Sequence, residues 1–180
     1  IEEPLLSSNN TYTVATLLRF NGMVSQAVYE ILNIVPDFIS SYDARRYALP
    51  NLMAIRKYNK KGNIYNRKTI LSSIKNNKLV LFGDYPYDTS KKHVIWTHVS
   101  EMFPSIQWVY NKKNELKNEN FDASDSLICV IGFINKEKYE GFEPKILNYQ
   151  EVDEGENTTF IYTFDFCGFE ISKKITIPKP

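Results

Sequence analysis

Residue types and patterns that identify particular chemistries are scarce in this sequence of 180 residues. It contains two cysteines, two histidines and seven glycines, with neither a Cys-x-x-Cys pair nor a glycine-rich phosphate loop among them. No apolar run approaches the roughly eighteen residues of a membrane-spanning helix, and no signal-peptide pattern opens the chain. The sequence therefore predicts no cofactor, no metal and no membrane partner.

The cysteines and histidines that are present do not form a catalytic or ligand pattern. His93 and His98 are five residues apart, whereas two metal ligands on one face of a helix are four apart. Cys129 and Cys167 lie in apolar runs, which disfavour the thiolate, so we expect two reduced thiols. We therefore expect the chain not to be an enzyme.

One enzymatic alternative stays open. Glu143-Pro144-Lys145 has the acid-x-Lys form of a metal-dependent nuclease, with Asp84, Asp122 or Asp125 as the second carboxylate. Pro144 counts against this alternative, because proline cannot donate a hydrogen bond to the ladder of a central strand. A metal-dependent nuclease is thus a distant third prediction.

The composition is that of a folded protein, with 43% hydrophobic, 14% aromatic and 24% charged residues. A chain of this length fits one domain, or two small subdomains that share a core. It begins with Ile1 and not with methionine, so we interpret it as a domain of a longer intracellular protein, nuclear or cytoplasmic.

Apolar residues recur at three- and four-residue spacing in the first part of the chain, as in amphipathic helices. The predicted helices cover residues 12–35, 36–49, 50–57, 66–76 and 93–103. Pro36, Pro50 and Pro104 mark their boundaries, and Asn66 is expected to cap the fourth. We expect the first helix, which is the longest, to anchor the rest of the fold.

After Pro104 the apolar period changes from about 3.6 to 2, which indicates strands. The predicted strands cover residues 78–82, 106–110, 127–134, 146–152, 160–166 and 169–177, and 112–125 is a predicted loop. The fold class is therefore α+β, with an N-terminal helical portion, helix-turn-helix or winged-helix-like, packed on a four- to five-stranded mainly antiparallel sheet. Residues 1–11 form a tether, 12–77 a basic helical subdomain and 78–180 a sheet subdomain, together one compact domain.

Charge is distributed unevenly, although the net charge is only +1. Residues 44–83 contain no Asp or Glu but ten cations: Arg45, Arg46, Arg56, Lys57, Lys60, Lys61, Arg67, Lys68, Lys75 and Lys78. Residues 114–170 have the opposite bias, with thirteen acidic residues against four lysines. A basic half beside an acidic half is typical of chains whose basic part contacts nucleic acid.

The cationic block is interleaved with tyrosines, a pattern typical of surfaces that bind phosphate. The helix 66–76 is the candidate insertion element, with the Lys60-Lys61 turn as a wing, and its polar side chains suit phosphates and base edges. The sequence therefore favours a non-enzymatic nucleic-acid-binding domain, with DNA favoured over RNA. An acidic protein partner, or pairing with the acidic half of the same chain, stays open as an alternative.

A second interpretation is a protein-interaction module of a larger intracellular assembly that contains other protein subunits. Tyr85 and Tyr87 lie in a predicted loop beside Gly83 and Pro86, so we expect them to be exposed and to bind a partner. Trp96 and Trp108 are better explained as core residues.

Overall fold

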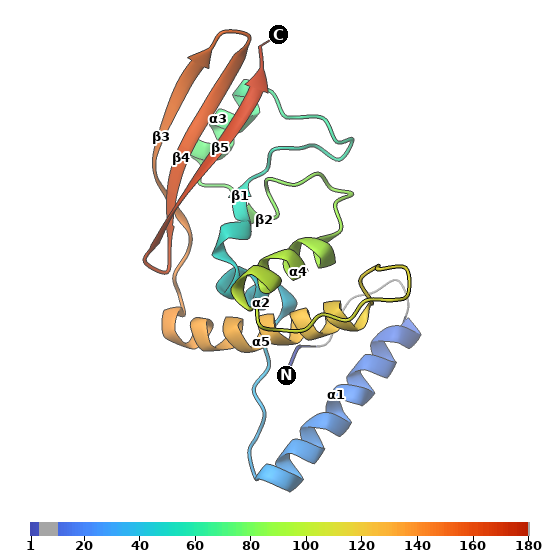
Figure 1. Ribbon diagram of the computed structural model, residues 1–180. Coiled ribbons are helices and arrows are strands. Elements are labelled where there is room, and N and C mark those ends of the chain that lie inside the picture. The colour runs from blue at the N-terminus through green and yellow to red at the C-terminus, as the bar shows by residue number, and fades with distance from the viewer. Residues whose placement is uncertain (4–10, 180) are drawn as a thin grey trace.

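The computed structural model describes residues 1–3 and 11–179, which fold into helices first and a three-stranded sheet last (Figure 1). In chain order the elements are α1 (Thr11–Leu32), α2 (Ser41–Ala48), the 3₁₀ turn η1 (Pro50–Leu52), β1 (Met53–Ile55), α3 (Arg67–Lys75), β2 (Leu79–Leu81), α4 (Lys91–Met102), α5 (Glu119–Tyr139), β3 (Lys145–Glu154), β4 (Asn157–Phe166) and β5 (Phe169–Pro178). The predicted α+β class is confirmed. Most of the predicted tether, residues 4–10, lies outside the described residues.

The long strands β3, β4 and β5 form an antiparallel sheet in that order, with β4 in the centre. Every second residue of β4 from Phe160 to Phe166 is an aromatic side chain buried on one face, which is the pleat pattern that the sequence predicts. A separate antiparallel pair joins β1 to β2. The strands are therefore divided between two sheets instead of forming one.

The first core cluster lies between the aromatic row of β4, α3 and β1, and α3 lies against the sheet in Figure 1. Ile70 and Ile74 of α3 are buried in it, together with Ile55 of β1. The hydroxyl oxygen of the fully buried Tyr162 accepts a hydrogen bond from the backbone N–H of Ile55 at 2.9 Å. This bond satisfies a buried donor and ties the small sheet to the large one.

The second core cluster lies where α2 crosses α5, with η1 and α4 beside them. Gly132 of α5 makes the crossing close, because a Cβ there would lie 2.4 Å from the carbonyl oxygen of Ala44 on α2. Ala48 and Ile128 fill the rest of the contact. Each cluster draws residues from both predicted subdomains, 12–77 and 78–180.

Residues 119–134 do not have the predicted structure. The expected strand 127–134 and part of the expected loop 112–125 lie in the helix α5. Four of its five buried positions, 121, 124, 128 and 132, are three or four residues apart, so a helix buries one stripe against α2 and α4. A short apolar run does not distinguish a buried strand from a buried helix. The expected strand 106–110 is irregular, with an isolated bridge from Tyr110 to Leu116.

The N-terminal helices also differ from the prediction. The second helix begins at Ser41 and not at Pro36, because the Ser40 hydroxyl caps it by accepting a hydrogen bond from Asp43 N at 3.1 Å. Residues 50–57, expected to be helical, contain η1 and β1. These elements and a turn separate α2 from α3, so the two helices are not joined by the short turn of a helix-turn-helix.

The helix α1 is the longest helix in the described residues, as expected, but it does not anchor the fold. None of its residues is buried, and it extends away from the other elements (Figure 1). The anchoring role belongs to the crossing of α2 and α5.

Replacing Gly132 with alanine should therefore destabilise the fold, because the added methyl group would overlap the Ala44 backbone. We expect the free energy of unfolding to fall by about 1–3 kcal/mol, the usual cost of overpacking, as measured by urea denaturation. Gly22→Ala on α1 is the control, since no heavy atom lies within 4 Å of its new Cβ. Equal destabilisation of the two variants would contradict the close crossing.

Candidate nucleic-acid interface

The cations predicted to form one basic surface occupy two regions of the fold. Arg45 and Arg46 lie on α2, beside α5, whereas the other eight lie between residues 56 and 78, around α3 and its neighbouring loops (Figure 1). The two regions differ in how far their charges are neutralised by the chain itself.

Arg46 does not lie on an open surface. Its side chain is buried, donates to the carbonyl oxygen of Phe142 at 2.8 Å and pairs with the Glu143 carboxylate at 3.0 Å. The guanidinium also lies 5.0 Å from the centre of the Phe166 ring. Arg45 pairs with Asp125 on α5 at 3.6 Å. Both α2 arginines are therefore engaged by carboxylates of the same chain, and we do not count them among the cations that are free to bind a ligand.

Arg56 and Lys57 are half-buried at the end of β1. The Arg56 guanidinium donates to the carbonyl oxygens of Phe82 and Leu81 at 3.1 and 3.4 Å, and lies 4.8 Å from the centre of the Tyr87 ring. Lys57 lies with its Nζ 5.3 Å from the centre of the Tyr58 ring. Arg56 thus holds the Tyr87 loop against the small sheet.

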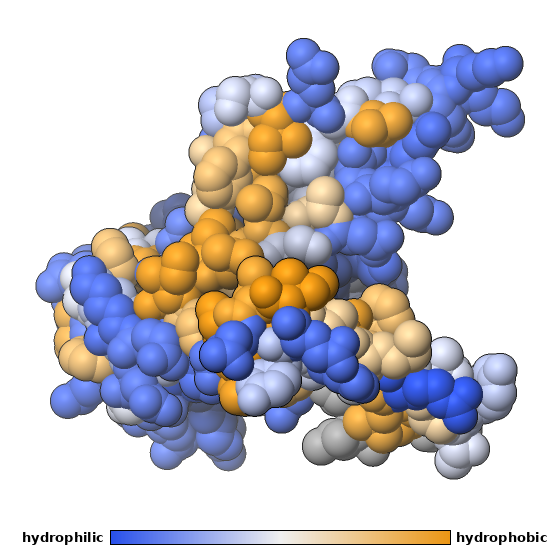
Figure 2. Space-filling model, turned by 90° about the horizontal axis from the view of Figure 1, so that it is seen from below, coloured by the Kyte–Doolittle hydropathy of each residue, from blue (hydrophilic) through white to orange (hydrophobic). Residues whose placement is uncertain are grey.

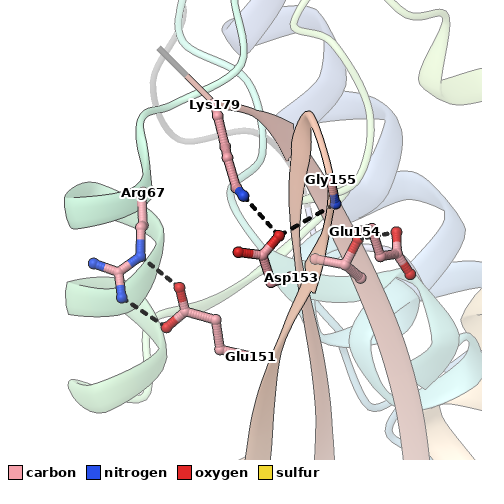
Figure 3. A network of polar contacts seen from close by, with 7 residues as sticks. Arg67, Glu151, Asp153, Glu154, Gly155 and Lys179 are labelled. Atoms are coloured by element: carbon pink, nitrogen blue, oxygen red, sulfur yellow. Dashed lines mark hydrogen bonds and ion pairs between the residues drawn. The ribbon is translucent and has the colours of Figure 1, made fainter.

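Arg67 opens α3 and faces the acidic strand β3, as Figure 3 shows. Its guanidinium makes a two-pronged pair with Glu151, with Nη2 to Oε2 at 2.8 Å. The hydrogen bond from Arg67 holds the pKa of Glu151 below its usual range. Arg67 is therefore also neutralised within the chain.

The other carboxylates at this end of β3 have partners of their own (Figure 3). Lys179 donates to Asp153 at 2.6 Å and lowers its pKa. Glu154 accepts from the Thr159 hydroxyl at 2.7 Å, the main cause of its lowered pKa, and pairs with Lys174 at 3.5 Å. Sequence reasoning missed these cations of β5 and the C-terminus, and the predicted antiparallel sheet was the signal that could have located them.

Five exposed lysines remain from the predicted set, and we call them the open lysines: Lys60, Lys61, Lys68, Lys75 and Lys78. Within residues 1–3 and 11–179, none of their ammonium groups has an acidic partner within ion-pair distance. They follow one another along a stretch that has no acidic residue. Their charge is consequently available to a ligand.

Lys60 and Lys61 lie at the tip of the predicted turn. The Asn59 side chain shapes it by accepting hydrogen bonds from the backbone N–H groups of Lys61 and Asn63 at 2.9 and 3.1 Å. Gly62 has a φ of +81°, a conformation that favours glycine. The turn is therefore fixed by its own sequence and presents both lysines to solvent.

Lys68 and Lys75 lie on the outer side of α3. They are seven residues apart, or about two helical turns, so they share one side of the helix. The core residues Ile70 and Ile74 lie on the other side. The predicted cap is confirmed, because the Asn66 side chain accepts a hydrogen bond from Thr69 N at 2.9 Å.

The predicted partner-binding tyrosines differ in their surroundings. Tyr87 is 46% exposed, although Arg56 lies over its ring. Tyr85 is half-buried and packs edge-on against Phe82 at 6.4 Å, and burial raises its pKa. Tyr85 therefore belongs to the edge of the second core cluster, and Tyr87 alone of the two is open to solvent.

Trp96 and Trp108 pack against each other with ring centres 6.0 Å apart.

Three of the carboxylates named for the nuclease alternative each pair with a different cation. Glu143 pairs with Arg46, Asp125 with Arg45, and Asp84 with Lys173 at 2.6 Å. The part of the chain that the structure describes contains no cluster of three His, Cys, Asp or Glu side chains suited to a metal. We therefore do not pursue this alternative.

The thiols and imidazoles lie in separate surroundings. Cys129 and Cys167 are free thiols, and burial raises the pKa of each to about 11. At neutral pH both are therefore protonated and poor nucleophiles. His93 packs against the Phe121 ring, whereas Nδ1 of His98 lies 3.9 Å from Glu101.

No protein-family model, curated protein or solved structure matches the chain. Among the helices in the described residues, none is long and apolar enough to cross a membrane. Inferences about function therefore depend on the residues and contacts above.

The Arg67–Glu151 pair can be tested by titration. Arg67→Gln should raise the pKa of Glu151 toward its usual value, as followed by NMR of the side-chain carboxyl carbon. Because folding lowers this pKa, the pair stabilises the native state above the unfolded pKa, and its contribution disappears as the pH falls through the folded pKa. Lys68→Gln, beside Arg67 in the sequence, should leave the Glu151 titration unchanged. An unchanged titration in Arg67→Gln would show that another group holds Glu151 ionised.

Proposed function

We propose that the chain binds the phosphate backbone of nucleic acid, DNA in the first instance, through the open lysines. The observation that supports this most strongly is that the neighbouring carboxylates are already paired with cations other than the open lysines. Glu151, Asp153 and Glu154 are engaged by Arg67, Lys179 and Lys174, respectively. The open lysines therefore keep an unopposed charge, and lysines of this kind gain affinity by releasing the counterions condensed on phosphates.

The N-terminus of α3 supports the proposal independently of this charge balance. Its first turn contains Arg67 and Lys68 and no acidic residue. Cations are unfavourable there, because the backbone N–H groups at a helix N-terminus carry partial positive charge. Glu151 compensates Arg67, whereas Lys68 has no such partner in the described residues. A phosphate group at this end of α3 would compensate both the charge of Lys68 and the partial positive charge of the helix N-terminus.

The expected mode of binding is largely independent of base sequence. The helix pair of a helix-turn-helix is absent from the described residues, and the four arginines within residues 44–83, which could read guanine, are engaged within the chain. Lysines at a turn and on one side of a helix suit backbone contacts, which position a protein on a duplex without specifying its sequence. Such binding weakens steeply as the salt concentration rises.

We expect a fluorescently labelled DNA duplex to bind at low salt in a fluorescence-anisotropy titration. The triple variant Lys61→Gln, Lys68→Gln, Lys75→Gln should bind more weakly at every salt concentration tested. If each lysine binds one phosphate, the slope of log affinity against log salt should become shallower by about 2.7, because each lysine–phosphate pair that is removed reduces the slope by about 0.9.

The matched control is the triple variant Lys112→Gln, Lys113→Gln, Lys117→Gln, in the loop before α5. These lysines are also exposed, and both triple variants lower the net charge by the same amount. The control should keep nearly the wild-type slope, because the proposal depends on position and not on total charge. Equal effects of the two variants, or no binding by the wild type at low salt, would refute the proposal.

A further inference from the structure

The segment from residue 11 to residue 38, which we call the arm, projects from the rest of the fold (Figure 1). It comprises α1 and the linker 33–38, and the linker joins the fold at Ile39, which lies beside residues 1–3. Glu3 N donates to Ile39 O at 2.8 Å, and Ile39 N donates to Ile1 O at 3.0 Å. The linker is therefore attached at Ile39, and the C-terminal end of α1 lies away from the other elements (Figure 1).

The arm leaves much apolar surface uncovered. Ten of its large apolar side chains have exposed fractions from 37% to 79%: Leu17, Leu18, Phe20, Met23, Tyr29, Ile31, Leu32, Ile34, Val35 and Phe38. At roughly 100 Å² for each half-exposed side chain, they present on the order of 1,000 Å². Monomeric soluble proteins rarely expose a contiguous apolar patch of more than a few hundred Å².

The outer side of α5 has a groove of about 520 Å³ that the arm of the same chain does not fill. Its apolar lining includes Cys129, Val130, Phe133 and Ile134 of α5 and Ile39, and its polar lining consists of Glu2, Asp122, Asp125 and Ser126. No α1 side chain lines it. Val130 and Ile134 are 59% and 61% exposed. Figure 2 views the molecule from the side on which α1 and α5 lie in Figure 1, and apolar surface gathers at its centre.

From these two surfaces we infer that two copies of the chain associate, with the arm of each copy docked in the α5 groove of the other. The lengths match, since helices of 22 and 21 residues are about 33 and 32 Å long at 1.5 Å per residue. The apolar surface of the arm also exceeds the ~800 Å² per partner of a standard stable interface. A two-fold axis makes the arm–groove contact twice, so the dimer is closed.

This association does not depend on nucleic-acid binding, and sedimentation equilibrium tests it without DNA. The wild-type chain should have twice the monomer mass of 21.0 kDa. The arm variant Leu18→Glu, Ile31→Glu should sediment as a monomer, because the added carboxylates would be buried in the partner's groove. The groove variant Val130→Glu, Ile134→Glu should also be a monomer. All four positions are exposed within the single chain, so its thermal unfolding should change little.

The matched control is Ala15→Glu, Gln26→Glu, which adds the same charge to α1 at exposed positions on the side opposite Leu17 and Ile31. It should remain a dimer. A monomeric wild type would overturn the inference, whether its arm folds back on its own α5 or inserts into vesicles of phosphatidylcholine and phosphatidylserine in a flotation assay. A groove variant that stays dimeric would also overturn it, because the arms would then pair with each other.

Discussion

The close crossing of α2 and α5 is the constraint on which the rest of the structure depends. Gly132 lets the α5 backbone approach Ala44, which places α2 between the two core clusters. Tyr47, on the same helix, packs against Phe166 of the sheet with ring centres 5.4 Å apart, so eight residues of α2 join the helical cluster to the sheet cluster. Arg46 completes the junction by pairing with Glu143 just before β3.

The cations of residues 44–83 have two roles: the arginines bind groups of the same chain, and the open lysines have no acidic partner in the described residues. The guanidinium groups of Arg45, Arg46 and Arg67 pair with carboxylates of the C-terminal half, and Arg56 binds backbone carbonyls, where a planar donor with several N–H groups is effective. The open lysines follow the strand β1 and lie at a turn and on the outer side of α3. The acidic half of the chain thus neutralises Arg45, Arg46 and Arg67 and leaves these lysines unopposed.

The sequence predicts the elements whose signals are local. Strands β3 to β5 follow from alternation, the start of α3 from Asn66, and the turn at residues 59–63 from its Asn and Gly residues. It does not predict features that depend on distant partners. The run 127–134 is helical because α5 packs on α2, and Arg46 is buried because Glu143 and Phe166 meet it in space. The sequence also does not predict that α1 is exposed, because an amphipathic pattern does not specify which surface covers the apolar side of a helix.

Backbone amide hydrogen exchange, measured with and without a DNA duplex at low salt, tests the central claim most directly. Ligand contacts slow exchange where they stabilise the local structure, so the method locates the binding surface without any substitution. We expect the added protection to be concentrated in residues 57–78, at the turn of Lys60 and Lys61 and along α3. Protection confined to α1, α5 or the Tyr85–Tyr87 loop, with residues 57–78 unchanged, would contradict it.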